Sequence, residues 1–200
     1  MKQFLSAVLA ILMLASLTVC AFANSPSQPT GGDGGGYYAP VKTDKDKADA
    51  EKDEAKAAKT LKVVAAEDKD GEDLIVGLGS LPKEATDAMK SEFDGLVNSL
   101  VSAKKALAKD ENAAIPADIK ADAADGAKLV AGPAFRVVAN KYPATITIAV
   151  ENPEDFVGIM IFENGKWVKL DVTVNDDGTV TFVLNHAAVL SIVSQVVAAA

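Results

Sequence analysis

The chain has 200 residues, of which 20 are basic and 28 acidic, for a formal net charge of −8; Cys20 is its only cysteine and His186 its only histidine. One cysteine excludes a disulfide within the chain, and one histidine excludes a metal site built on two histidines. The acidic balance, without a basic cluster, disfavours nucleic acid and anionic lipid as partners. We therefore expect no metal, no cofactor and no nucleic-acid partner.

The first 23 residues have the pattern of a Sec signal peptide. Lys2 precedes an apolar run that ends in Ala21-Phe22-Ala23, a small-residue cleavage site. Cleavage after Ala23 predicts a secreted, cysteine-free chain that keeps no transmembrane segment. Lipoprotein processing at Cys20 is the alternative, although Val19 is larger than the residue that usually precedes a lipidated cysteine.

Residues 24–59 are predicted to form a disordered linker. Its first part, Asn24 to Pro40, is rich in Gly, Pro and Ser and is typical of a flexible tether. Its second part, Lys42 to Lys59, consists almost entirely of Lys, Asp, Glu and Ala, so it is either disordered or a solvated helix. The remaining residues, 60–200, predict a single α+β domain that is long enough to bury its own core.

The domain is expected to begin with two strands, at residues 61–66 and 74–78, joined by an acidic turn at Asp68–Asp73. The Asp68-x-Asp70-Gly71 fragment is shared with calcium loops. The further oxygen ligands of such a loop are absent at the required spacing, which favours an ordinary turn.

Residues 81–110 predict one long helix. Ser80 can cap it, Pro82 lies in its first turn, and its apolar residues recur at helical spacing. We expect the stripe to pack on the β core, with an exposed partner-binding face as the alternative. The stripe consists of Met89, Phe93, Leu96, Leu100 and Leu107.

Residues 128–139 return to strand character around Gly132-Pro133. Arg136, the only arginine, interrupts the apolar pattern of the second half. An arginine at such a position either binds an anionic ligand or pairs with an acidic side chain, and the many acids of this chain favour the pair.

The C-terminal stretch 144–197 is predicted to be the β core. Ile146, Ile148 and Val150 alternate with polar or small residues, as in a strand with one buried face. Asn164-Gly165 is a strong signal for a two-residue hairpin, because a type I′ turn needs positive φ at both central positions. Several such strands at regular spacing favour an antiparallel β-sandwich, either Ig-like or a partly closed barrel, with the long helix inserted.

The same stretch resembles a small C-terminal β domain of secreted and surface proteins of Gram-positive, often gut-dwelling, bacteria. The shared motifs are an ITI-type strand, an NGKW hairpin at Asn164–Trp167, a second hairpin at Val174–Phe182, and a last strand at Ala188–Val193. Where that family has Ser and Pro before the last strand, this chain has Asn185-His186-Ala187. The resemblance implies an extracellular, non-catalytic module and supplies no functional residue.

Trp167 is the residue that we predict to contact a ligand. By strand alternation it shares a face with Lys169 and Asp171, and an outward Trp can stack on a sugar or a peptide. In the alternative interpretation, a helix or loop covers this face and makes Trp167 a core residue.

The sequence contains no catalytic motif, so we expect no enzyme and no catalytic residue. The prediction is a secreted structural or binding module for an extracellular protein or glycan. One alternative is a glycan hydrolase, which requires two converging carboxylates. Another is a homo-oligomer that pairs through a strand edge.

Overall fold

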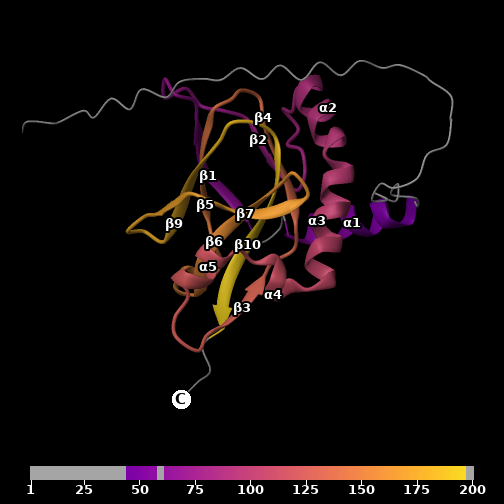
Figure 1. The fold of residues 1–200 in the computed structure, drawn as a ribbon. Helices are drawn as coiled ribbons and strands as arrows, with labels where there is room; N and C mark the ends of the chain where they lie inside the picture. Colours follow the sequence, from indigo (N-terminus) through magenta and orange to yellow (C-terminus); the bar gives the residue numbers. More distant parts are fainter. Residues whose placement is uncertain (1–43, 58–60, 197–200) are drawn as a thin grey trace, which may run out of the picture. The chain divides into compact units, whose positions relative to one another are not determined.

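The computed structural model describes residues 44–57 and 61–196, which form two antiparallel sheets and a set of helices (Figure 1). One sheet has four strands in the order β1-β5-β9-β8. The other has six, in the order β2-β4-β10-β6-β7, with β3 also paired to β10. The predicted α+β, sandwich-like fold is confirmed.

Most strands are short, and all neighbouring pairs are antiparallel. The first five are β1 (Lys62–Glu67), β2 (Val76–Leu78), β3 (Lys128–Ala131), β4 (Phe135–Ala139) and β5 (Ala144–Ala149). The last five are β6 (Phe156–Glu163), β7 (Lys166–Leu170), β8 (Val172–Val174), β9 (Thr179–Leu184) and β10 (Ala188–Val196). The helices are α1 (Asp44–Ala57), α2 (Asp87–Gly95), α3 (Val97–Lys109), α4 (Glu111–Ala114) and α5 (Ala117–Asp122).

The main core lies between the two sheets. Most strands contribute every second residue to it, because successive side chains of a strand point to opposite faces. Its fully buried members include Val137, Ile146, Ile148, Ile159, Val180, Leu184 and Leu190.

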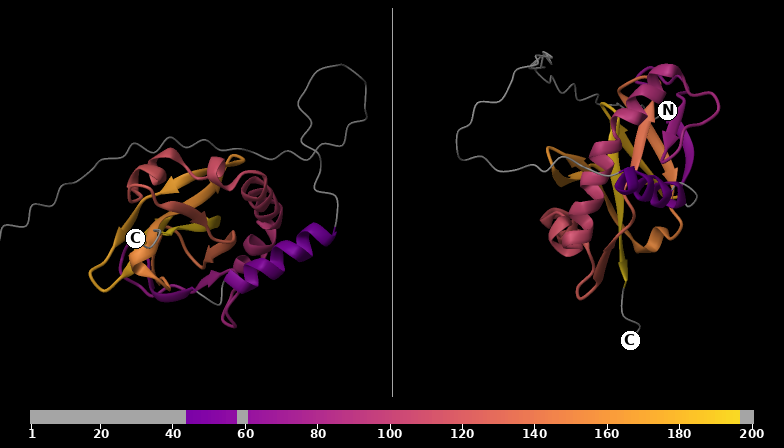
Figure 2. Two further views of the ribbon diagram at one scale, coloured as in Figure 1. Left: turned by 90° about the horizontal axis from the view of Figure 1, so that it is seen from below. Right: turned by 90° about the vertical axis from the view of Figure 1, so that its right-hand side faces the viewer.

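The six-stranded sheet is buried on its second face as well, by the helices (Figure 2). All five residues of β4 are buried for this reason. The uninterrupted apolar run in β6 has the same cause, since a strand that is covered on both faces needs no polar face.

The predicted helix at 81–110 is in fact two helices that meet at Leu96. The first begins six residues later than expected, because Thr86 rather than Ser80 caps it: Thr86 Oγ1 accepts from the Met89 amide at 3.2 Å. The predicted stripe does pack on the β core, with Met89, Phe93 and Leu100 buried.

Residues 44–57 are not disordered: of the two alternatives for this segment, the structure shows the helix. These residues form α1, which packs against α3 and β4. Ala50 and Glu54 are its buried residues. The predicted signal peptide and tether, residues 1–43, lie outside the described residues.

The hairpin between β6 and β7 has the predicted backbone, with φ of 50° at Asn164 and 78° at Gly165. We expect Gly165→Ala to lower the free energy of unfolding by about 1 kcal/mol, because the left-handed region costs an L-residue about 1–2 kcal/mol. A Cβ at Gly165 would meet nothing within 4 Å, so the cost is one of backbone conformation alone. Denaturant unfolding measures it, and Asn164→Gly, which relieves the turn, should not destabilise the protein.

Candidate functional site

Trp167 lies inside the protein and is only 7% exposed. Its ring meets Phe162 edge-on at 5.2 Å between centroids, within the core cluster that the helices form on the six-stranded sheet. Trp167 is therefore a core residue, as the alternative interpretation held, and the structure does not place it where a ligand could stack on it.

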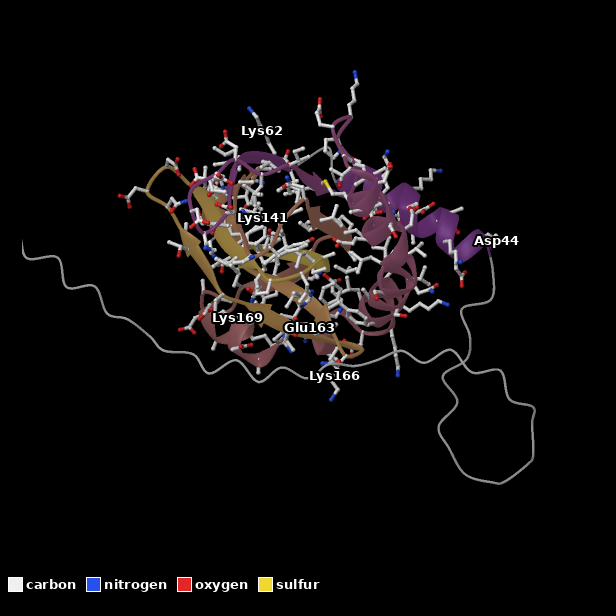
Figure 3. All side chains as sticks on the ribbon, turned by 90° about the horizontal axis from the view of Figure 1, so that it is seen from above. Asp44, Lys62, Lys141, Glu163, Lys166 and Lys169 are labelled. Atoms are coloured by element: carbon white, nitrogen blue, oxygen red, sulfur yellow. The ribbon has the colours of Figure 1, made fainter. Side chains whose placement is uncertain are left out.

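The other two predicted site residues lie near the surface. Lys169 Nζ is 2.5 Å from Asp122 Oδ2, an ion pair that ties β7 to α5. Asp171, between β7 and β8, is exposed. Figure 3 shows Lys169 on β7 away from the hairpin, near which Glu163 and Lys166 lie. The structure thus brings Lys169 and Asp171 near the surface, whereas Trp167, on the same face of β7 as Lys169, is covered by the helices.

Lys169 and Asp171 both line a groove of about 550 Å³, which we call the edge groove. It opens between the two sheets, where β7 and the end of β9 diverge. Val168 and Val183 are 40% and 46% exposed there. The lining residues are Ile161, Glu163, Val168, Lys169, Leu170, Asp171, Val172, Thr173, Thr181, Phe182, Val183, Leu184, Asn185 and His186.

Two unpaired strand edges border the edge groove. Among the described residues, β7 pairs only with β6. β9 pairs with β8 at residues 180–182, but Val183 and Leu184 have no partner on that side. The reason is that the chain passes from one sheet to the other at Asp171, so β8 covers only half of β9.

The carboxylates of the edge groove stand at opposite ends of β7. Glu163 pairs with Lys166 across the hairpin, and Asp171 follows the last residue of the strand. The strand rise separates these ends by roughly 16 Å. Paired carboxylates of glycosidases lie about 5–9.5 Å apart, so these two do not converge on one bond.

A second polar site is buried beneath α1. Glu54 is fully buried, and its Oε1 accepts from the Arg136 backbone amide at 2.5 Å and from Arg136 Nε at 3.0 Å. Its Oε2 accepts from Arg136 Nη2 at 2.6 Å. The guanidinium stacks on Phe93, 3.7 Å from the ring centre, and Nη1 donates to the Phe93 carbonyl. This confirms the expectation that Arg136 pairs with an acid.

Burial raises the pKa of Glu54, and the hydrogen bonds from Arg136 act against that rise. Sequence reasoning missed Glu54 because its neighbours are nearly all charged, which is typical of a solvated helix. The only signal was indirect: one arginine within an apolar strand requires a buried acid, but the sequence does not say which.

The acidic turn after β1 is also held by an ion pair. Lys141 Nζ pairs with Asp68, and the Asp70 and Glu72 amides donate to Asp68 Oδ1 at 2.8 and 3.0 Å. These contacts, led by the bond from Lys141, lower the pKa of Asp68 to about 2. The calcium-like fragment therefore forms a turn that the Asp68 carboxylate stabilises through hydrogen bonds to the turn and to Lys141.

Acid should remove the stabilisation that the ionised Asp68 carboxylate gives to the folded protein. The unfolded chain binds the Asp68 proton near its usual pKa of 3.8. The stabilisation is therefore complete above about pH 4 and is lost as the pH falls to about 2. We expect Asp68→Asn to be less stable than the native chain at pH 7 and equally stable at pH 2, in denaturant unfolding at both pH values. An equal difference at both would contradict this assignment.

Within residues 44–57 and 61–196, no three His, Cys, Asp or Glu side chains are grouped so that they could hold a metal ion. None of the helices in these ranges is both long and apolar enough to cross a membrane. In comparisons with protein-family models, curated proteins and solved structures, no match to this chain was found.

Proposed function

We propose that this protein is a secreted, non-catalytic binding module that takes up an extended peptide in the edge groove. The observation that carries the proposal is the pair of unpaired strand edges, β7 and the end of β9, on either side of the edge groove, whose lining is both apolar and polar. An incoming strand can pair with one of these edges through its main chain, as in β-strand addition.

The groove lining supports a peptide rather than a glycan. Val168, Leu170 and Val183 offer apolar contacts for the side chains of an inserted strand. Sugars bind to exposed aromatic faces, whereas the aromatic residue of this lining, Phe182, is only 3% exposed.

The two lysines of β7 argue against the alternative in which two copies of the protein pair through this strand. Lys166 and Lys169 lie on this edge strand, and lysine is a residue with which proteins protect an exposed edge from pairing. Two copies of β7 would bring these lysines together. A peptide of another sequence need not carry lysines opposite those of β7. The exposed edge of β7 therefore favours such a peptide over a second copy of β7.

A library of extended peptides displayed on phage tests the proposal against the full chain. We expect selected peptides to alternate apolar and polar residues, and to bind Val168→Lys at least tenfold more weakly than the native chain. Val64→Lys is the matched control, since Val64 is 53% exposed on β1, away from the groove. N-methylation of alternate residues of a selected peptide should also abolish binding.

Equal binding to Val168→Lys and to the native chain would refute the edge groove as the site. Failure to enrich any peptide would refute peptide uptake itself.

Secretion is tested separately, by expressing the chain with its own leader in a Gram-positive host. The protein recovered from the medium should begin at Asn24. A chain that begins at a lipidated Cys20 would instead support the lipoprotein alternative.

A further inference from the structure

The charge of the edge groove changes along β7. At the hairpin end, Glu163 lies opposite Lys166, and His186 Nε2 is 3.7 Å from Glu163 Oε1. One carboxylate and one ammonium balance each other at this end. Figure 3 shows Lys166 beside the hairpin and Lys169 farther along the strand, towards Asp171.

The Asp171 end of the groove carries an excess of acid. Lys169 Nζ is 2.5 Å from Asp122 Oδ2. This hydrogen bond raises the pKa of Lys169, and the nearby charges of Asp118 and Asp171 add to the rise. Three carboxylates therefore lie around one ammonium, and the excess of negative charge among these four side chains favours a further cation at this end.

The edge groove is closed at its acidic end and open at the hairpin. The chain passes from β7 to β8 through Asp171, and β8 pairs with β9 at residues 180–182. Since β7 and the end of β9 diverge from this point, a peptide that lies between them cannot continue beyond Asp171. One end of the peptide is therefore held against the acids, whereas the other end can extend past the hairpin.

The longer of the two free edges belongs to β7. It comprises Lys166–Leu170, whereas the free part of β9 is Val183 and Leu184. All strand pairs among the described residues are antiparallel, and an antiparallel pair is slightly more stable per residue than a parallel one. Because β7 runs from the hairpin to Asp171, a peptide antiparallel to it has its N-terminal end at the closed, acidic end of the groove.

We infer that the peptide bound in the edge groove runs antiparallel to β7, with a basic residue at its N-terminal end beside Asp171 and an acidic residue opposite Lys166. This inference rests on the proposed function, because it concerns the peptide of the same groove. The peptide residues opposite Leu170 and Val168 are apolar, since facing side chains of paired strands lie about 4.5–5.5 Å apart. Read from its N-terminal end, the peptide is basic, apolar, polar, apolar, polar and acidic.

The order of the charges fixes the direction of the peptide. Opposite charges on facing positions of two strands stabilise the pair, and like charges destabilise it. A peptide with the reverse order, bound in the same direction, would place an acid beside Asp171 and a base opposite Lys166. It would lose both attractions and gain two repulsions.

Two peptides of equal composition test the inference, Lys-Val-Thr-Val-Thr-Glu and Glu-Val-Thr-Val-Thr-Lys. Both are acetylated and amidated, so that their termini carry no charge. A neutral peptide with Thr in place of both charged residues is the reference for the proposed function. Each peptide is titrated into the ¹⁵N-labelled full chain, and its dissociation constant is measured from the amide NMR signals of β7 and the end of β9.

We expect the first peptide to bind at least tenfold more tightly than the second, with the neutral peptide between them. The double variant Lys166→Glu with Asp171→Lys should reverse this order. Both side chains are exposed, so the exchange leaves the fold intact. The matched control, Lys62→Glu with Asp176→Lys, makes the same two exchanges at exposed positions outside the groove and should keep the native order.

Equal binding of the two charged peptides would overturn the inference and leave the groove as a peptide site. Tighter binding of the second peptide would also overturn it, because the charges would then match a peptide of the opposite direction. If none of the three peptides, the neutral one included, shifts the signals of β7, the proposed function fails and the inference fails with it.

Discussion

Replacing Glu54 with alanine is expected to release α1 and to lower the free energy of unfolding by about 3 kcal/mol. Removing one partner of a buried ion pair costs about 3–5 kcal/mol, because the other charge stays buried without compensation. The lower end applies here, since release of α1 lets water reach the Arg136 guanidinium. For a chain of this size, such a loss lowers Tm by about 6–12 °C.

Hydrogen exchange distinguishes release of the helix from general unfolding. In Glu54→Ala the amides of α1 should lose their protection, while those of β10, in the middle of the six-stranded sheet, should keep it. Asp44→Ala, at the far end of the same helix, is the matched control and should change neither.

A double variant tests the physical cause. Glu54→Leu combined with Arg136→Met removes both charges, so no buried charge is left without a partner, and most of the lost stability should return. If the double variant is as unstable as the sum of the single ones, the ion pair is not the cause of the loss.

Replacing Trp167 with alanine is expected to cost about 3–5 kcal/mol of unfolding free energy, as for other large buried aromatic residues. The side chain fills the space between β7 and the helices, and its loss leaves a cavity lined by Phe162 and its neighbours. Denaturant unfolding, followed by circular dichroism because Trp167 is the only tryptophan, gives the value.

Trp167→Phe should cost clearly less. The indole Nε1 is buried and has no hydrogen-bond partner among the described residues, so phenylalanine loses volume but no hydrogen bond. Val168→Ala is the control on the neighbouring position, where the side chain is 40% exposed in the edge groove. If Trp167→Ala has the same denaturant midpoint of unfolding as the unaltered protein, the residue is not part of the core.

The elements that sequence reasoning predicted well are those with a local cause. Asn164-Gly165 forms its hairpin because few residues other than Asn and Gly adopt positive φ without cost. The alternation of Ile146 and Ile148 with smaller or polar residues marks a strand wherever that strand lies in the sheet. Gly132-Pro133 likewise separates β3 from β4, as predicted.

The errors arose where two signals competed or where a partner was distant. Ser80 and Thr86 are both suitable caps, and the choice of Thr86 depends on where Met89 and Phe93 meet β4 and its neighbours. Alternation places Trp167 and Lys169 on one face of β7. Whether the helices cover that face depends on α3 and α5, which are distant from β7 in the sequence.

The sequence by itself determined the strands, the turns and the class of fold, because these follow from backbone preferences and from the period of apolar residues over a few positions. Only the tertiary structure decided the two sites. The edge groove exists because the chain changes sheet at Asp171 and leaves the end of β9 unpaired. Glu54 becomes a buried partner because β4 presents Arg136, 82 residues away, at the position that α1 covers. Contacts over such distances depend on how the elements pack, and no local pattern of residues records them.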